Sequence, residues 1–559
     1  MSEAWPDIAG LTLLTAAYWF VDLSCRRGAF TNVLRRLGLQ SVTSLATVTC
    51  GMCFGIAMQV PWSALTEHSA VRLVASLVSC MLAWKATTRD IDLVQGDFAQ
   101  GSRILLSTGA IGVGFSPVFL PLVAWLLSTP FATWEHHATL PMRLLQAITA
   151  WAILGLTPYG ATVHVLFWFL LVIQISHYLI SAVAKAWLGP KWYSWITDNQ
   201  MHHLAASAYS WGWAKFLPWE RWRRVISAIQ RVEKPAQLLA FGIEALAPLA
   251  LLSTTAGIVF CLGWSAFHLG VFGLSGLLFW DWVGANIAVA LGIWTLPADV
   301  ISPAFGVGAV CTSLIFIVVF PFRHKLWKPI PLGWWDTPFT QRIHWYAHGQ
   351  SGRAYGVYAD VMCPHERLFG KVGGCFFAPM PVVTYHLGEV WKHELRDAIR
   401  AAGPNMGRLD AVREQFGVLP RSEALSVNHV QYLRRFFYRM NEGARKSVLP
   451  PILRWLKAPG GQVFYWGDLP PYRGQERIIR VTLHYREEYF DGDSIHRLCD
   501  EQVADIPIDS SAALVEPVEA PTPRDMDDFL LSFAAGRLID LPKFIDGYLQ
   551  SDDGKRPPA

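Results

Sequence analysis

Ionisable side chains interrupt the apolar stretches of this chain at only a few positions. The segment "HYLISAVAKAW", residues 177–187, closes an uncharged run and places Lys185 where a membrane helix would still lie in lipid or just leave it. A charged side chain at the centre of a bilayer costs about 2.5 to 3.5 kcal/mol. Residues retained at that cost are candidates for function. Further polar residues in comparable settings are His136, His137, His177, Glu244 and His268.

Each of these residues also has a structural interpretation. A lysine near a helix end commonly extends its amine to the lipid headgroups. A single buried histidine commonly donates to a backbone carbonyl, and Glu244 is expected to pair with a basic group and fix helix packing rather than to react.

Composition places these residues in a membrane protein. Of the 559 residues, 52% are hydrophobic and only 16% are charged, whereas a soluble domain carries about 25% charged residues. The net charge of +4 is small and dispersed, which argues against nucleic-acid binding. The sequence contains no glycine-rich phosphate loop, so it gives no support for soluble nucleotide chemistry.

The uncharged stretches predict a polytopic helix bundle in the cell membrane. A spanning helix needs about 20 mostly apolar residues. The longest stretch contains the turn sequence Thr-Pro-Tyr-Gly at 157–160, so it should cross twice. Together with a short helix at 8–21, this predicts about eight spans. The uncharged stretches are 37–66, 104–134, 144–184, 245–280 and 300–322.

The segment 190–234 is basic and rich in tryptophan. Aromatic and basic side chains anchor proteins at membrane interfaces. We therefore expect this segment to be a loop along the membrane surface. Its tryptophans are Trp192, Trp195, Trp211, Trp213, Trp219 and Trp222.

Charge density rises after residue 322, which predicts a membrane domain at 1–329 and a soluble mixed α/β domain at 330–514. Apolar and polar residues alternate at 479–486, the period of a half-buried strand. Residues 387–415 have the pattern of an amphipathic helix. The region 515–559 is predicted to be a linker followed by a helix, at about 525–549.

No convincing metal site or disulfide framework is found. The 9 cysteines are odd in number and scattered, and Cys50 and Cys53 are best explained as small packing residues in an apolar helix. His344 and His348 are four residues apart and would share a helix face, yet no nearby acidic residue completes a metal set.

Three segments together resemble a known family. "HYLISAVAKAWLGPKWYSW", "IEALAPLALL" and "FHLGVFGLSGLLFWDW" are similar to the membrane domain of vitamin K-dependent gamma-carboxylases and their bacterial relatives, the HTTM-domain proteins. The resemblance covers roughly residues 100–325. It implies Lys185 as catalytic base and His137 and His268 as orienting or electrophilic groups. The cofactor-contacting residues it implies are His136, His177 and Glu244.

The resemblance also implies the chemistry. In gamma-carboxylases a lysine takes a proton from a reduced quinone, whose reaction with O2 yields a base strong enough to remove a γ-proton from glutamate, and CO2 traps the carbanion. A lysine amine is a base near neutral pH only when its pKa falls from about 10.4, and burial in an apolar environment is the physical route to that shift. The implied cofactors are a vitamin K-type quinol or menaquinol, O2 and CO2. The substrate would be a peptide or a small molecule, and hydroxylation or epoxidation are alternatives to carboxylation.

Two other classes of function remain open. Intramembrane polar residues also line transport paths, although the sequence shows no inverted repeat of hydropathy. A lipid- or quinone-binding scaffold without chemistry would need Lys185 only as an anchor among membrane lipids.

Overall fold

The computed structural model of the chain describes residues 8–26, 51, 60–88, 100–134, 139–323, 325–329, 331–357, 386–416, 423–443, 451–459 and 469–511. The sequence-based predictions at His136, His137, Cys50, Cys53 and 515–559 lie outside these residues.

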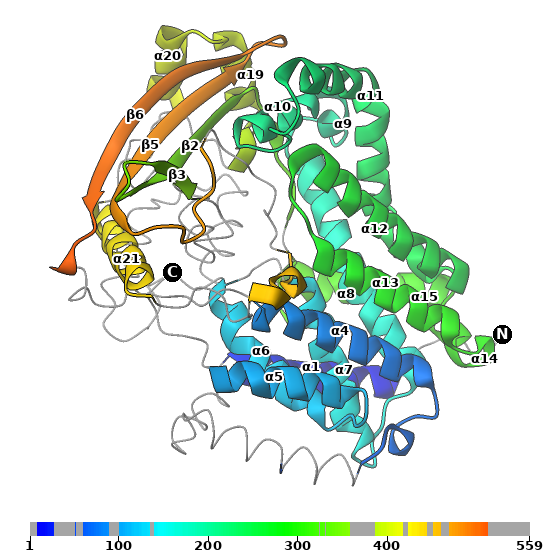
Figure 1. Ribbon diagram of the computed structural model, residues 1–559. Coiled ribbons are helices and arrows are strands. Elements are labelled where there is room, and N and C mark those ends of the chain that lie inside the picture. The colour runs from blue at the N-terminus through cyan, green and yellow to red at the C-terminus, as the bar shows by residue number, and fades with distance from the viewer. Residues whose placement is uncertain are drawn as a thin grey trace.

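Apolar helices pack into a bundle around α8, whose side chains are buried on nearly every face. Figure 1 shows this bundle at the lower right, with α8 and α12 rising toward a smaller group of helices above. The longer helices of the bundle are α1 (Ile8–Arg26), α4 (Ser69–Thr87), α5 (Gln100–Val113), α6 (Phe119–Trp134), α7 (Thr139–Gly155), α8 (Val163–Trp187), α12 (Thr254–Ser275), α13 (Trp280–Thr295) and α15 (Val307–Val319).

Four described helices are long and apolar enough to cross a membrane, and they support membrane association. A fifth candidate is the pair Trp280–Thr295 and Ala298–Ala304, bent by 118° at its break. The shorter apolar helices of the described chain have 10–17 residues. A spanning helix needs about 20, so these helices do not confirm the remaining predicted spans. The expected turn at 157–160 is confirmed, since α7 ends at Gly155 and α8 begins at Val163.

The segment predicted as an interfacial loop is instead largely helical, which corrects the prediction. It forms α9 (Ser194–Asp198), α10 (His202–Ser210) and the first part of α11 (Trp219–Ala245). Most of its tryptophans are buried. Their indole N–H groups donate hydrogen bonds to neighbouring segments, as buried tryptophans usually do. For example, Trp195 donates to the carbonyl of Trp334 and Trp222 to that of Ala205. The buried tryptophans are Trp195, Trp211, Trp213 and Trp222.

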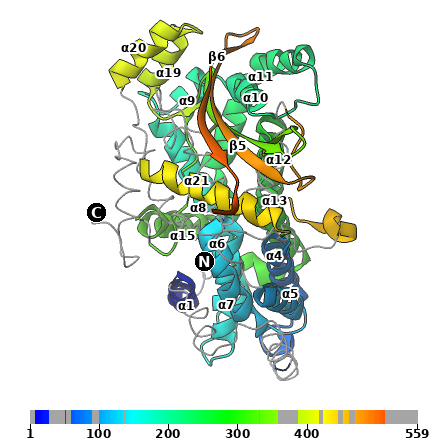
Figure 2. The ribbon, with the colours of Figure 1, turned by 60° about the vertical axis from the view of Figure 1, so that its left-hand side comes forward.

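An antiparallel sheet with strand order β3-β2-β5-β6 follows the bundle in sequence. Figures 1 and 2 show it beside the upper helices, with α21 near the ends of β5 and β6. The strands are β2 (Phe339–Gly349), β3 (Ala354–Val357), β5 (Ile478–Phe490) and β6 (Ile495–Pro507), and a separate pair is formed by β1 (Trp335–Asp336) and β4 (Glu389–Val390).

His344 and His348 lie on strand β2, so the expected shared helix face is wrong. Four residues along a strand separate two side chains by about 13 Å, too far for one metal ion. His348 Nε2 contacts the Thr482 hydroxyl at 2.9 Å. Among the described residues, no group of three or more potential metal ligands occurs.

The predicted alternating strand is confirmed as β5, with one local exception. Ile479 is exposed, although its period-two partners Val481, Leu483 and Tyr485 are buried. The pairing with β2 passes from Arg480 to Ile478 between neighbouring β2 residues, which leaves Ile479 as the extra residue of a bulge. Side-chain direction changes there because a bulge breaks the alternation.

The expected helix at 387–415 is two helices, α19 (His393–Ala402) and α20 (Met406–Phe416). Gly403 separates them with a φ of +61°, a conformation that favours glycine. Residues 386–390 form a short turn and β4 instead. A further helix among the described residues of this region is α21 (Glu423–Asn441), followed by a short 3-10 helix, η7 (Pro451–Leu456).

Candidate functional site

Lys185, in the last turn of α8, lies inside the protein. Its Nζ donates to both carboxylate oxygens of Glu244, on α11, at 2.8 and 2.6 Å. A third hydrogen bond, 2.8 Å long, goes to the carbonyl of Leu332. The side chains of Lys185 and Glu244 are 8% and 2% exposed, so the amine does not extend to the headgroups. Glu244 therefore pairs with a basic group, as expected.

Residues 331–336 cover the Lys185 amine, and we call them the covering segment. Besides the Leu332 carbonyl, this segment contributes Trp334, whose carbonyl accepts from Trp195. The Trp195 ring lies 5.2 Å from the Lys185 amine. A Cβ at Gly333 would come within 2.9 Å of Ala184 Cβ and the Lys185 backbone nitrogen. The segment is thus in direct contact with the backbone of α8.

A chain of polar side chains crosses the bundle one to three turns before Lys185. Gln174 Nε2 donates to Asn286 Oδ1 at 2.8 Å. Asn286 Nδ2 then donates to the Tyr178 hydroxyl at 2.9 Å. The same hydroxyl lies 2.9 Å from His268 Nε2. Helices α8, α12 and α13 supply these residues, and all four side chains are buried.

This chain favours one tautomer of His268. The Tyr178 hydroxyl accepts from Asn286 and has one hydrogen of its own, and among the described residues His268 Nε2 is the acceptor within hydrogen-bond distance of it. In the neutral imidazole the proton then resides on Nδ1. That Nδ1–H group is buried and has no hydrogen-bond partner within the described residues.

His177 presents the opposite polarity. Its Nδ1 lies 3.0 Å from the carbonyl of Ile173, so Nδ1 carries the hydrogen and donates. In the neutral imidazole Nε2 is then an acceptor, and it too has no partner among the described residues. Both imidazoles pack against the same indole, since the rings of His177 and His268 lie 5.4 and 5.2 Å from that of Trp282.

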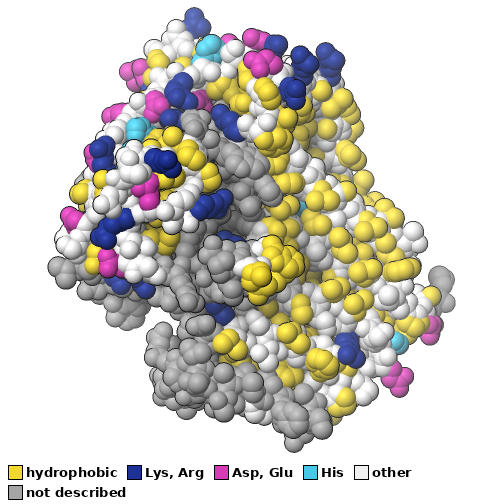
Figure 3. Space-filling model, viewed as in Figure 1, with side chains coloured by type: hydrophobic (Ala, Val, Ile, Leu, Met, Phe, Trp, Pro, Cys, Tyr) yellow, Lys and Arg dark blue, Asp and Glu magenta, His cyan; other side chains and the backbone are white. Residues whose placement is uncertain are grey.

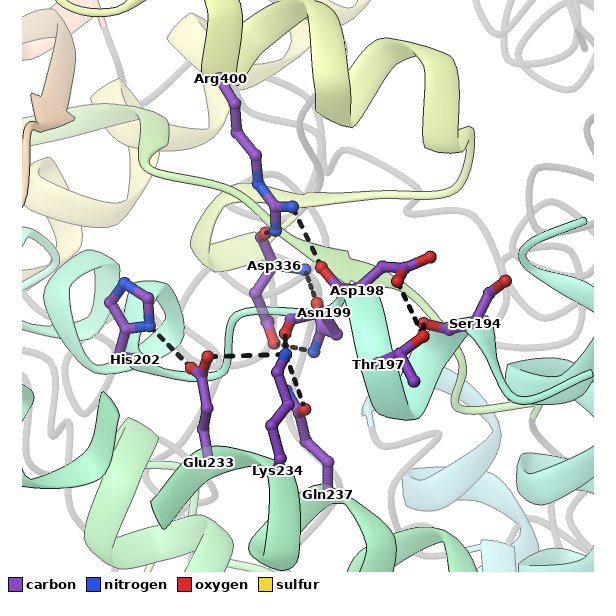
Figure 4. Close-up of polar contacts among 10 residues, drawn as sticks. All are labelled: Ser194, Thr197, Asp198, Asn199, His202, Glu233, Lys234, Gln237, Asp336 and Arg400. Atoms are coloured by element: carbon purple, nitrogen blue, oxygen red, sulfur yellow. Dashed lines mark hydrogen bonds and ion pairs between the residues drawn. The ribbon is translucent and has the colours of Figure 1, made fainter. Parts of the chain in front are cut away.

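A second polar cluster lies where α9, α10 and α11 meet the covering segment and α19 (Figure 4). His202 Nδ1 contacts Glu233 Oε2 at 2.7 Å, and both residues are buried. Lys234 Nζ donates to the Asn199 carbonyl at 2.6 Å, and its distance to Glu233 Oε1 is 3.5 Å. Figure 4 shows Lys234 between this pair and Asn199.

The same cluster attaches the covering segment. Asn199 Nδ2 donates to Asp336 Oδ2 at 2.7 Å, and the Asp336 backbone N–H donates to Asn199 Oδ1 at 2.8 Å. Arg400, on α19, donates to the carbonyls of Asp198 and Asp336 at 3.0 and 3.2 Å. The end of the covering segment is thus held by both a membrane-bundle connection and a helix of the sheet region.

Burial and hydrogen bonding shift the acids of this cluster in opposite directions. Burial raises the pKa of Asp336 to about 7, despite the hydrogen bonds from Asn199 and Trp334. Burial also acts to raise the pKa of Glu233, but the hydrogen bond and charge of His202 outweigh it, and the pKa of Glu233 is lowered. Burial holds the pKa of His203 well below its usual value.

The structure brings four of the predicted site residues together as two pairs. Lys185 and Glu244 are in direct contact, and His177 and His268 flank one ring, whereas His136 and His137 lie outside the described residues. Sequence reasoning did not find the bridging residues Tyr178, Asn286 and Asp336, nor the pair His202 and Glu233. The available signal was the Asn in an apolar helix and the adjacent pair of histidines at the start of α10.

Comparison of the chain with protein-family models, curated proteins and solved structures finds no match. The resemblance of residues 100–325 to gamma-carboxylases and HTTM-domain proteins therefore stays a prediction.

Proposed function

We propose that this chain is a multi-pass membrane enzyme of the gamma-carboxylase type, which binds a reduced quinone and couples its oxidation by O2 to carboxylation of a peptide or small substrate. The observation that carries the proposal is the pair of buried imidazole nitrogens, at His177 and His268, that have no hydrogen-bond partner among the residues the structure describes. One is a donor, one is an acceptor, and both flank Trp282.

These groups fit a hydroquinone. A hydroquinone is a flat, apolar ring with oxygens that donate and accept hydrogen bonds. Ligand sites of this kind combine apolar and aromatic walls with a few placed polar groups. A buried polar atom without a partner costs about 1–3 kcal/mol, and a bound ligand that satisfies it recovers that cost. The apolar bundle also suits a lipid-soluble ligand that enters from the bilayer.

In this proposal the protein's residues orient the ligand and accept protons. His177 Nε2 accepts a hydrogen bond from a quinol hydroxyl, and His268 Nδ1–H donates to an oxygen, with Tyr178 and Asn286 holding the imidazole of His268 in place. A bound reduced quinone would supply the electrons that reduce O2 and thereby the strong base that the substrate requires.

Lys185 and Glu244 would form a proton-sharing pair. Transfer of a proton from the Lys185 ammonium to Glu244 produces a neutral amine and a neutral carboxylic acid. Taking two charges out of water carries a desolvation cost, which the neutral form of a pair avoids. The neutral amine is then a general base. The Leu332 carbonyl holds the amine in position in either form.

A scaffold without chemistry is the second candidate. It is favoured by the complete hydrogen bonding of the Lys185 amine, whose three hydrogen bonds match the three donors of an ammonium group. In that case the pair would only attach α8 to α11, and wild-type protein would not turn over any quinol.

The test uses the purified full chain with a reduced naphthoquinone or menaquinol. We expect O2 uptake above a detergent blank, and incorporation of labelled bicarbonate into a glutamate-containing peptide. Lys185→Arg keeps a charge that can pair with Glu244 but cannot deprotonate at usable pH, because the guanidinium pKa exceeds about 12. It should lose at least about two decades of rate with little change in thermal stability.

The matched control is Lys85→Arg. Lys85 forms the other buried lysine–carboxylate pair of the described bundle, at 2.7 Å from Asp281, and has no part in the proposed chemistry. The Lys85→Arg variant should consume O2 at the wild-type rate. Turnover by Lys185→Arg within a few-fold of wild type would remove Lys185 as the base. No O2 uptake by wild type with any of these quinols and peptides would favour the scaffold.

A further inference from the structure

Helix α11 exposes a stripe of basic and apolar residues along one side. Positions three and four apart recur along this side from residue 221 to residue 239, the spacing of a single helix face. Its residues are all exposed: Arg221, Arg224, Val225, Ala228, Arg231, Val232, Pro235, Leu238 and Leu239. The buried opposite side includes Trp222, Ile226, Glu233, Gln237 and Glu244.

The arginines of this stripe have no acidic partner in the described part of the chain. Arg223, on the side that faces the sheet, does pair with Asp493. No ion pair involving Arg221, Arg224 or Arg231 occurs among the described residues. The three guanidinium groups are therefore available to an external anion.

Pro235 divides the stripe into a basic half and an apolar half. Before it lie the three arginines, and after it Leu238 and Leu239 are 58% and 71% exposed. This end of α11 packs beside α12, where Trp264 donates to the carbonyl of Ile243 on α11. Figure 3 shows hydrophobic side chains covering the face over α12 and α13, with Lys and Arg side chains at its upper edge.

Exposed aromatic side chains lie beside the apolar half of the stripe. Trp187 and Trp192, at the end of α8 and just after it, are 79% and 64% exposed, and the Trp192 ring lies 6.1 Å from that of Phe241 on α11. Exposed tryptophans at the boundary of an apolar face are typical of the membrane–water interface. The basic half continues the same helix away from these tryptophans, toward its N-terminus.

We propose that the basic half of α11 is a binding surface for anionic phospholipid headgroups. Arg221, Arg224 and Arg231 would contact phosphate oxygens, while Val225 and Val232 between them meet the first acyl methylenes. The occupant is membrane lipid rather than a free phosphate because the arginines continue directly into the exposed leucines of the same helix. This surface is separate from the quinol site proposed above.

The test places the full chain in lipid nanodiscs that contain spin-labelled phosphatidylglycerol or phosphatidylcholine, and measures the motionally restricted fraction of each label. Wild type should prefer phosphatidylglycerol, and the preference should fall in 0.5 M salt, where the Debye length is about 4 Å. In the triple variant Arg221→Gln, Arg224→Gln, Arg231→Gln the preference for phosphatidylglycerol should fall at least about fivefold. A fivefold change is about the effect of a single basic residue near an anionic surface.

The matched control removes the same charge from the sheet region through Arg353→Gln, Arg408→Gln and Arg473→Gln, which are exposed positions. This control variant should retain the wild-type preference for phosphatidylglycerol. Equal thermal midpoints in pure phosphatidylcholine establish that both variants are folded. An unchanged preference in the α11 variant would overturn the proposal. Displacement of the labelled lipid by millimolar glycerol phosphate would instead identify a site for free phosphate compounds.

Discussion

At the scale of single residues, polar atoms without partners distinguish functional groups from structural ones. Tyr178 and Asn286 have their hydrogen bonds satisfied inside the bundle, whereas His177 Nε2 has none among the described residues. An unsatisfied buried atom reduces the stability of the free protein by about 1–3 kcal/mol. A group retained at this cost is better explained by a ligand than by packing.

His177→Phe tests this explanation. Phenylalanine keeps an aromatic ring against Trp282 and removes the unpartnered nitrogen, so the thermal stability of the ligand-free protein should stay equal or increase, by about 1 kcal/mol. Quinol-dependent O2 uptake should fall by at least about 100-fold. The measurements are thermal unfolding and O2 consumption on the same preparation.

His164→Phe is the control for this prediction, because His164 lies near the opposite end of α8 and contacts Thr162. It should leave O2 uptake unchanged. A large loss of stability in His177→Phe would show that the imidazole has a structural role.

At the scale of elements, one ion pair and one short segment position α8. Lys185 joins α8 to α11 through Glu244, and the covering segment lies against α8 and accepts from the Lys185 amine. Breaking a buried pair leaves an uncompensated charge and costs about 3–5 kcal/mol, whereas replacing both partners by apolar residues is often neutral.

Lys185→Met should therefore destabilise the protein strongly, and the double variant Lys185→Met, Glu244→Met should recover most of the lost stability. Both should be inactive if the amine is the base. Thermal unfolding in detergent measures the first effect and O2 uptake the second. Should the double variant retain wild-type turnover, the pair has no catalytic role. Should it remain as unstable as the single variant, the pair itself is needed for packing.

The covering segment is expected to tolerate no added side-chain atom at Gly333. A Cβ there would meet the backbone of Lys185 and Ala184 at 2.9 Å, so Gly333→Ala should cost about 1–3 kcal/mol through overpacking. Gly270→Ala, in α12, meets nothing within 4 Å and should be neutral or stabilising. Thermal midpoints of the two variants give the comparison, and equal midpoints would mean that the covering segment is free to move away from α8.

At the scale of the whole molecule, the cluster in Figure 4 joins the membrane bundle to the sheet region. Asp336 on the covering segment contacts Asn199, which follows α9, and Arg400 on α19. Lys234 on α11 also donates to the Asn199 carbonyl. Arg396 adds a guanidinium group 4.0 Å from the ring of Trp335, the neighbour of Asp336. Ionisation at this junction should therefore affect the stability of the whole protein.

The expected pH dependence follows from Asp336. Its pKa is raised from 3.8 to about 7 in the folded protein, so between these values the folded state binds more protons than the unfolded state. Stability from this group is fully present below pH 3.8 and is lost as the pH rises through 7. The total change is on the order of 4 kcal/mol. The pKa of Glu233 is lowered from 4.5, so the stability that this group contributes is present above pH 4.5 and is lost as the pH falls.

Asp336→Asn isolates this contribution. Asparagine cannot ionise, so the decrease in the thermal midpoint between pH 5 and pH 8 should become smaller than in wild type. Asp397→Asn is a suitable control, because Asp397 is a largely exposed acid on the same junction helix, α19. An unchanged pH dependence in Asp336→Asn would mean that this carboxyl group is not the one that titrates.

The sequence by itself determined the features that depend on neighbouring residues. The apolar runs gave the helices of the bundle, the proline and glycine at 157–160 gave the turn between α7 and α8, and alternation gave β5. Lys185, Glu244 and His268 were also identifiable, because a polar residue inside an apolar run is visible without a fold. These signals are local, since hydrophobic period and turn chemistry act within a few residues.

Only the tertiary structure decided which of these groups meet. Lys185 and Glu244 are 59 residues apart in sequence, and Tyr178 and His268 are 90 apart. Sequence also misjudged the four buried tryptophans of 190–234 and the strand position of His344, because burial and pairing depend on segments packed from elsewhere in the chain. Partners, tautomers and unsatisfied atoms arise from that packing, and so no local pattern encodes them.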